Sequence, residues 1–277
     1  MSFINFNDVS FAYPPVEGDV DAEGKQIIPQ PVFDHFTAEL PGGFTSLIGP
    51  NGSGKSTFLL LASGRLVPQN GTALLFGQNA AALSGEEKNL LASVIFQNME
   101  FETTEKVKEL LEFVYKTGAL KAKAAAVKGS GDLFDEVLNT FELNSVLEHG
   151  LTQLSKGEIQ RTLLAFSVLY GSRSIFMDEP LFAMEEPQKE KCLEYLRLFS
   201  EKTKTPVYIC MHELDLSRRY AENVMLFFPN RDITFGTPDE ILTDADLEKA
   251  YGFPASMLKN KEAMTREHLL ELSKYSL

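Results

Sequence analysis

Residues 49–57 read GPNGSGKST and match the pattern G-x-x-x-x-G-K-[ST]. The apolar run at 44–50 predicts a strand before this stretch, and the run at 54–66 predicts a helix after it. Its three glycines allow the backbone to wrap so that successive N–H groups point inward, and the start of a helix adds positive potential. This context favours a phosphate-binding loop over a glycine-rich turn without a ligand.

The side chains of this loop predict a nucleotide with its metal ion. We expect Lys55 to reach the β- and γ-phosphates and the Ser56 hydroxyl to bind Mg²⁺. The expected nucleotide-binding residues of the loop are Asn51, Gly52, Ser53, Gly54, Lys55, Ser56 and Thr57.

Residues 173–180, RSIFMDEP, carry two adjacent acids at the end of a predicted strand. In open α/β sheets the carboxyl ends of the strands form the ligand-binding edge. We expect Asp178 to hold Mg²⁺ through its water shell and Glu179 to polarise a water that attacks the γ-phosphate. Two acids at a strand end are often only a solvated turn, but their pairing with a phosphate loop favours the catalytic interpretation.

The order of periodic segments predicts an α/β fold with a mostly parallel sheet. A proline-rich acidic stretch at 14–31 predicts an exposed hairpin loop, and residues 98–150 have helical spacing that interrupts the β/α alternation. We expect one nucleotide-binding domain over 1–277, with its ATPase core in 1–97 and 151–240. Residues 98–150 would be a helical subdomain and 241–277 a tail of short helices.

Composition limits the classes of partner. The chain has 39 Asp and Glu against 26 Lys and Arg, a formal charge of −13, so we expect no nucleic acid partner. Cys192 and Cys210 form no metal-binding pattern, which fits a reducing compartment. We find no secretory signal and no run of about 18 apolar residues, so we expect a cytoplasmic protein whose partner spans any membrane it serves.

Four further landmarks identify a family. Tyr13 precedes the phosphate loop, Gln97 opens the helical segment, LSKGEIQR at 154–161 closes it, and His212 follows the strand YICM. The ordered set resembles the ABC ATPases, the nucleotide-binding subunits of ATP-binding-cassette transporters. The resemblance covers about residues 3–255. It implies a RecA-like P-loop NTPase core with an N-terminal antiparallel β subdomain and an inserted α-helical subdomain.

The resemblance also implies roles for individual residues. Tyr13 would stack on adenine, Gln97 would contact Mg²⁺ and sense the membrane partner, and His212 would contact the γ-phosphate. In a dimer that encloses two ATP molecules, Ser155 and Gly157 would act on the ATP held by the opposite subunit. The catalytic residues would be Glu179, His212 and Gln97, and the Mg²⁺ ligands would be Ser56, Gln97 and Asp178.

Two positions depart from the family pattern. Residues 181–185 are LFAME, where the family has a small residue pair followed by Ala-Leu-Asp, and this loop normally reaches across the dimer interface. Lys156 replaces a glycine of the family's LSGGQ; we expect it to point to solvent with ordinary helical dihedrals.

The tail at 236–253, GTPDEILTDADLEKAYGF, resembles the ending of ATPases that serve metal-chelate importers (iron–siderophore, haem, vitamin B12, zinc). We therefore expect an ATPase subunit of such an importer, bound to an integral membrane permease at the inner face of the membrane and most simply a homodimer. Two alternatives stay open: a soluble, non-transport ABC ATPase of the iron–sulfur assembly type, and a regulatory cassette with weak hydrolysis. The transported molecule and the direction of transport cannot be assigned from the sequence.

Overall fold

A six-stranded sheet forms the centre of the molecule in a computed structural model, which describes residues 3–18, 20–21, 23–96, 99, 103–121, 126–128, 131–254 and 256–258. Its strand order is β10-β9-β3-β8-β7-β6, and all neighbours are parallel except the edge strand β10. Every residue of β3 and β8 is buried, as expected for parallel strands that are covered on both faces. The mostly parallel sheet predicted from the sequence is therefore confirmed. The strands are β3 (Phe44–Ile48), β6 (Ala92–Ile95), β7 (Ser174–Asp178), β8 (Val207–Cys210), β9 (Asn223–Phe227) and β10 (Ile233–Gly236).

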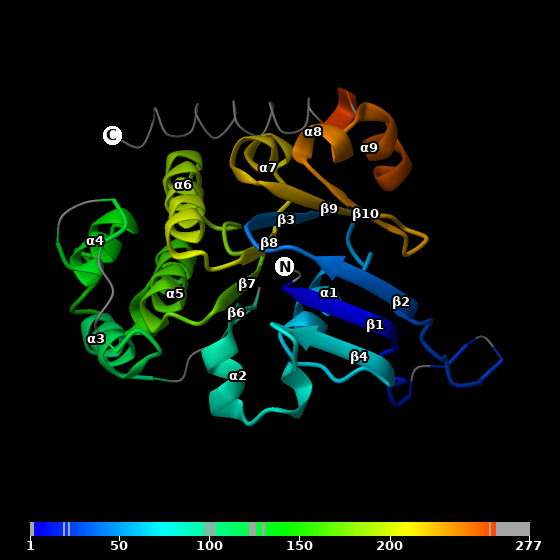
Figure 1. Ribbon diagram of the computed structural model, residues 1–277, viewed down its shortest axis with the longest axis horizontal. Helices are drawn as coiled ribbons and strands as arrows, with labels where there is room; N and C mark the ends of the chain where they lie inside the picture. The colour runs from blue at the N-terminus through cyan, green and yellow to red at the C-terminus, as the bar shows by residue number, and fades with distance from the viewer. Residues whose placement is uncertain are drawn as a thin grey trace.

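A second, antiparallel sheet has the order β2-β1-β4-β5 and lies on the right in Figure 1. Helix α1 (Lys55–Ala62) joins the two sheets, because Phe58 packs on Phe6 of the small sheet and on Phe227 of the large one, with ring centroids 5.0 and 5.9 Å apart. The phosphate loop is thereby fixed between two packed layers. The strands are β1 (Ile4–Phe11), β2 (Phe33–Leu40), β4 (Asn70–Leu75) and β5 (Gln78–Asn79).

The helices α3 and α4 gather at the end of the molecule opposite the small sheet, with α5 and α6 between them and the large sheet (Figure 1). One apolar core joins these four helices to the central strands. The helices are α2 (Gly85–Leu91), α3 (Val107–Thr117), α4 (Leu133–Thr140), α5 (Lys156–Tyr170), α6 (Glu186–Thr203), α7 (Leu214–Tyr220), α8 (Pro238–Ile241) and α9 (Asp244–Tyr251), with short 3₁₀ turns at Ala80–Ala82 and Leu151–Gln153.

Helix α2 was not anticipated from the sequence. It is only seven residues long, so its periodicity is weak, and it is specified mainly by the capping box of Ser84 and Glu87. The described residues of the stretch 14–31 are mostly exposed, as predicted, and Val20 and Gln26 form an antiparallel bridge within it. The predicted helices beyond residue 258 lie outside the described residues.

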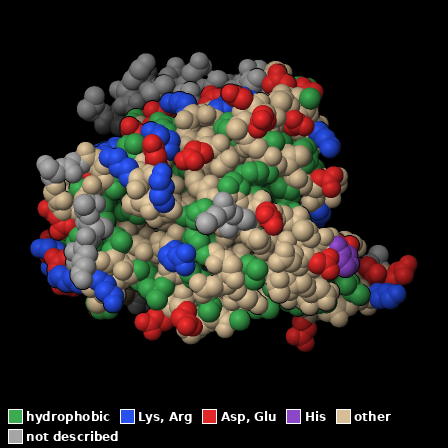
Figure 2. All heavy atoms as spheres, viewed as in Figure 1, with side chains coloured by type: hydrophobic (Ala, Val, Ile, Leu, Met, Phe, Trp, Pro, Cys, Tyr) green, Lys and Arg blue, Asp and Glu red, His purple; other side chains and the backbone are tan. Residues whose placement is uncertain are grey.

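Among the described residues, no helix combines the length and apolarity needed to cross a membrane. On the face drawn in Figure 2, lysine and arginine side chains of these residues lie interspersed with acidic ones, in keeping with the acidic composition.

Candidate functional site

The phosphate loop lies between the end of β3 and the start of α1, where the sequence predicted it. Gly52 and Gly54 have φ values of 76° and 107°, which glycine adopts without strain. Gly54 is the N-cap of α1 and supplies no side-chain hydrogen bond, so the first amides of the helix have no side-chain cap. The loop therefore presents backbone donors at a helix N-terminus, the arrangement that binds phosphate.

Lys55 is buried beneath this loop, with 6% of its surface exposed. Its ammonium donates to the carbonyl oxygens of Gly49 and Pro50 at 2.8 and 3.0 Å. Burial lowers the pKa of Lys55, and the nearby Glu179 and Asp178 carboxylates oppose this effect. The amine is thus held next to the loop interior, close to the acids at the end of β7.

Three hydroxyls of the loop differ in their surroundings. The Ser53 hydroxyl is buried and has no hydrogen-bond partner, whereas Ser56 is exposed. The Thr57 hydroxyl lies 3.1 Å from the Tyr13 hydroxyl, which brings the predicted adenine-stacking ring onto the first turn of α1. Tyr13 is 42% exposed and its ring packs edge-on against Phe11. One face of the ring is therefore available to a ligand beside the loop.

The two predicted acids come at the end of β7. Asp178 is the last residue of the strand, and Glu179 follows with φ at 49° in the left-handed region. The Glu179 amide donates to the Cys210 carbonyl oxygen at 3.2 Å, which holds this turn against β8. The Glu179 carboxylate lies 2.7 Å from Nε2 of His212. The predicted catalytic acid and the predicted γ-phosphate ligand are thus in direct contact.

Cys210 lies across the parallel ladder from Asp178 and is fully buried. Burial raises the pKa of the Cys210 thiol well above its usual value, with the Asp178 carboxylate adding to the effect. The thiol therefore stays protonated and can act as a donor to Asp178. The sequence indicated only that Cys210 belongs to no metal-binding pattern.

A single cavity of 1010 Å³ collects most of the predicted site. Its wall contains Tyr13, Asn51, Gly52, Gly54, Lys55, Ser56, Thr57, Glu179 and His212. It also contains residues that were not assigned to the site from the sequence, namely Pro29 and Gln30 from the loop before β2, Phe182, Arg231, Tyr251 and Phe253. Phe182 lies three residues after Glu179, and Tyr251 and Phe253 end the 236–253 stretch, but no spacing in the sequence indicated that these side chains line the cavity.

Ser155 and Gly157 do not line this cavity; they lie at the start of α5. Ser155 is the N-cap, and its hydroxyl accepts from the Glu158 amide at 3.3 Å and donates to the Glu158 carboxylate at 2.7 Å. Lys156 is exposed and begins the helix with ordinary dihedrals, as expected. Within one chain these residues form a complete cap, so a role in catalysis requires a second subunit. Gln97 lies outside the described residues.

The donor set fits Mg²⁺ and a nucleoside triphosphate. The buried hydroxyl of Ser53 has no partner, and the uncapped amides of α1 and the Lys55 ammonium are donors suited to phosphate oxygens. Ser56 and Asp178 offer oxygen ligands for a metal ion. Among the residues described, no group of three or more His, Cys, Asp or Glu side chains is arranged to hold a metal ion. Mg²⁺ typically takes one or two protein oxygens and completes its shell with water and phosphate, so this sparse set suits it.

Comparison with known proteins gives a consistent result. A family model described as ABC transporter matches residues 36–182. The hemin import ATP-binding protein HmuV of Pseudomonas fluorescens is 28% identical, with 83% of this chain and 86% of the relative covered. The energy-coupling factor transporter ATP-binding protein EcfA3 of Oenococcus oeni is 29% identical, with 95% of each covered. The molybdenum import ATP-binding protein ModC of Saccharophagus degradans is 27% identical, but the chain spans only 64% of its length.

Solved structures show the same fold. An ATP-binding subunit of an ABC transporter superposes with a TM-score of 0.68 at 19% identity, covering 94% of this chain and 99% of the other. A dimeric bacterial ABC transporter cassette superposes with a TM-score of 0.64 at 22% identity, covering 81% and 94%.

Proposed function

The chain belongs to the ABC transporter family, and we propose that it is the ATP-hydrolysing subunit of an ABC importer. The observation that carries this proposal is the meeting of three separate segments in one cavity: the phosphate loop after β3, Glu179 after β7 and His212 after β8. Each follows the carboxyl end of a neighbouring strand, the edge at which open α/β sheets bind ligands.

In this proposal the loop 51–57 binds the phosphates of ATP and Tyr13 stacks on the base. Lys55 exchanges its bonds to the Gly49 and Pro50 carbonyl oxygens for bonds to the terminal phosphates. Ser56, Asp178 and Gln97 would hold Mg²⁺, which neutralises charge on the phosphates when bound. The protonated thiol of Cys210, on the neighbouring strand β8, donates to the Asp178 carboxylate and keeps it oriented.

The reaction is the transfer of the γ-phosphoryl group from ATP to water. Glu179 accepts a proton from that water, and His212, at 2.7 Å from the carboxylate, holds it in place and contacts the γ-phosphate. The left-handed backbone at Glu179 turns the side chain out of the strand direction and toward the cavity. The products are ADP and inorganic phosphate.

The second half of each site would come from another subunit. Ser155 and the Gly157 amide stand at a helix N-terminus, which suits an anion, yet they do not reach the cavity of their own chain. We propose a homodimer in which the start of α5 closes on the ATP of the opposite subunit.

A membrane permease would complete the assembly and hold the subunit at the inner face of the membrane. A mainly apolar hollow of 370 Å³ lies between β6, α3 and α5. Its wall includes Ile95, Leu110, Val114 and Phe166. An apolar hollow at the end of β6, beside α3 of the proposed helical subdomain, is a suitable binding site for a segment of the permease.

The importer class rests on relatives named for import of haem and molybdenum and for energy-coupling factor transport. They favour a transporter over a soluble, non-transport ATPase. Within that class we propose a metal chelate or a similar small solute as cargo. We also propose the domain boundaries expected from the sequence: a core in 1–97 and 151–240, a helical subdomain in 98–150 and a tail in 241–277.

The test combines hydrolysis with co-purification. The purified chain should release inorganic phosphate from ATP with Mg²⁺ and stop when the metal is chelated. Expressed with its neighbouring genes and extracted in detergent, it should bring down a polytopic membrane protein. Hydrolysis by the purified chain together with the absence of any co-purifying membrane protein would support the soluble alternative instead, and ATP binding without hydrolysis would support the regulatory one.

A further inference from the structure

The first turns of α5 contact the backbone of Ala183 at both its amide and its carbonyl oxygen. The Ala183 amide donates to Oε1 of Gln160 at 3.0 Å. The Ala183 carbonyl oxygen lies so close to Gly157 that a Cβ on this glycine would be 2.7 Å away. Gly157 has no positive φ, so a glycine is needed here for this close approach and not for its backbone freedom.

Ala183 belongs to the short segment that connects Glu179 to α6. The segment is a compact turn, with hydrogen bonds from the Phe182 amide to the Glu179 carbonyl oxygen and from the Met184 amide to the Leu181 carbonyl oxygen. Leu181 and Met184 are buried, whereas the Phe182 side chain is 72% exposed. Because only three residues separate Glu179 from Ala183, a shift of Ala183 moves the carboxylate that faces His212.

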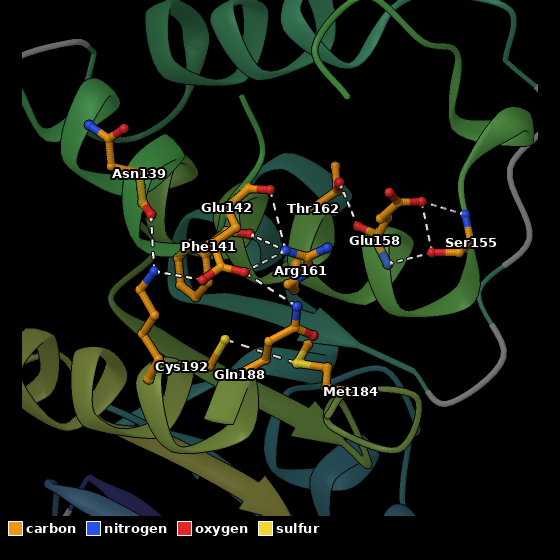
Figure 3. A network of polar contacts seen from close by, with 11 residues as sticks. Asn139, Phe141, Glu142, Ser155, Glu158, Arg161, Thr162, Met184, Gln188 and Cys192 are labelled. Atoms are coloured by element: carbon orange, nitrogen blue, oxygen red, sulfur yellow. Dashed lines mark hydrogen bonds and ion pairs between the residues drawn. The ribbon is translucent and has the colours of Figure 1, made fainter. Parts of the chain in front are cut away.

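A cluster of polar and charged side chains around Glu142 links α5 to α6 (Figure 3). The Glu142 carboxylate accepts from Arg161 of α5 at 3.3 Å, and from Gln188 and Lys191 of α6 at 3.3 and 2.8 Å. Arg161 also donates to the Phe141 carbonyl oxygen at 3.2 Å. The two helices that flank the 180–185 segment are therefore tied together through one carboxylate.

We propose that Gln160 is a positioning residue for Glu179, and that it couples the start of α5 to the catalytic carboxylate of the same chain. This inference rests on the proposed function, in which Ser155 and Gly157 contact the ATP of the opposite subunit. When that ATP fixes the start of α5, Gln160 and Gly157 fix Ala183, and Ala183 sets the turn that presents Glu179. Each subunit thus responds at its own carboxylate to the ATP held by its partner.

The decisive variants change the acceptor and little else. Gln160→Met keeps the length of the side chain but cannot accept the Ala183 amide, whereas Gln160→Glu retains an acceptor oxygen at the same reach. Thr37→Val is the matched control, because the Thr37 hydroxyl also accepts a backbone amide, from Asp8 at 3.0 Å, but lies in the small sheet. The Asp8 amide bond is exposed and the Ala183 amide bond is partly buried, so losing the acceptor costs at least as much stability in Gln160→Met as in Thr37→Val.

We expect Gln160→Met to lower kcat of ATP hydrolysis by about tenfold with KM near that of Thr37→Val, and its Tm to lie at or below that of Thr37→Val. We expect Gln160→Glu to restore kcat to near the wild-type value. Hydrogen exchange should be faster at the Ala183 amide in Gln160→Met and unchanged in Thr37→Val. If Gln160→Met folds poorly, Gln160→Asn, whose amide is one methylene too short, should show the same loss of kcat.

The outcomes separate this inference from the proposed function. If the wild-type chain does not hydrolyse ATP, the proposed function fails and the inference fails with it. If the wild-type chain hydrolyses ATP but Gln160→Met has the kcat of Thr37→Val, or Gln160→Glu is as slow as Gln160→Met, only the positioning role of Gln160 is overturned.

Discussion

Replacing Lys55 with methionine should separate the stability of the fold from nucleotide binding. Methionine approximates the apolar stem of lysine but has no ammonium group. In the structure this ammonium is buried and donates to the Gly49 and Pro50 carbonyl oxygens at 2.8 and 3.0 Å. The substitution therefore removes two charge-assisted hydrogen bonds and one buried charge at the same time.

The two effects on stability have opposite signs. Each hydrogen bond from a charged donor contributes about 1.5–3 kcal/mol, so losing both costs about 3–6 kcal/mol. Removing the ion relieves a desolvation penalty of several kcal/mol, the same penalty that lowers the pKa of Lys55. We therefore expect the free energy of unfolding to change by less than about 2 kcal/mol and Tm by only a few degrees.

Nucleotide binding has no such compensation. The phosphates lose a charged donor that is worth about 1.5–3 kcal/mol, which raises Kd for ATP by about 10- to 150-fold. Calorimetric titration with ATP and thermal unfolding of the same samples measure both quantities. Unchanged affinity would refute a phosphate role for Lys55. A fall in Tm of more than about 10 °C with unchanged affinity for ATP would show that Lys55 stabilises the fold and does not bind phosphate.

Three further substitutions test separate parts of the account. Tyr13→Ala should raise Kd for ATP by about tenfold through lost stacking, measured by fluorescent-nucleotide titration. Tyr13→Phe loses only the bond to Thr57 and should bind ATP nearly normally. An equal loss of affinity in both variants would argue against stacking. Gly64→Ala should lower the free energy of unfolding, measured in urea, by more than about 2 kcal/mol. The reason is that φ of Gly64 is 70° and a Cβ there would lie 2.5 Å from the Ala80 carbonyl carbon. A smaller loss of stability would mean that the backbone of this turn shifts to make room for the methyl group. The hydrogen bond from Lys191 lowers the pKa of Glu142, so this carboxylate stabilises the fold above its ordinary pKa of 4.5 and loses that effect as the pH falls through the lowered value. The difference in unfolding free energy between wild type and Glu142→Gln should therefore shrink below pH 4.5, and a constant difference would contradict the ion-pair assignment.

The parts of the fold that the sequence predicted are those with strong local patterns. The apolar run at 44–50 and the predicted strand within 173–180 are confirmed as β3 and β7, because short apolar runs bounded by turn residues favour buried strands. Helix α2 was missed because a seven-residue helix covers less than two full turns and buries only Leu91. Its capping box was the one available signal.

The candidate site likewise has parts that the sequence predicted and parts that it did not. The phosphate loop and the acids at 178–179 were predictable because their chemistry is concentrated in a few consecutive residues. Arg231 and Tyr251 were not, because only the tertiary fold brings them to the same cavity. The contact of Gln160 with Ala183 depends on how α5 packs against a loop that departs from the family pattern, and no spacing in the sequence encodes it.

Hydrolysis of ATP by the Glu179→Gln variant tests the central claim most directly. Glutamine keeps the size of the side chain but cannot accept a proton from water, and general-base catalysis contributes about 10²–10⁴-fold to rate. We expect phosphate release to fall by at least about 100-fold while Kd for ATP stays at the wild-type value, with the variant trapped as an ATP-bound dimer in light scattering. Phosphate release at the wild-type rate would contradict the assignment of Glu179 as the catalytic base and the account of the site built on it.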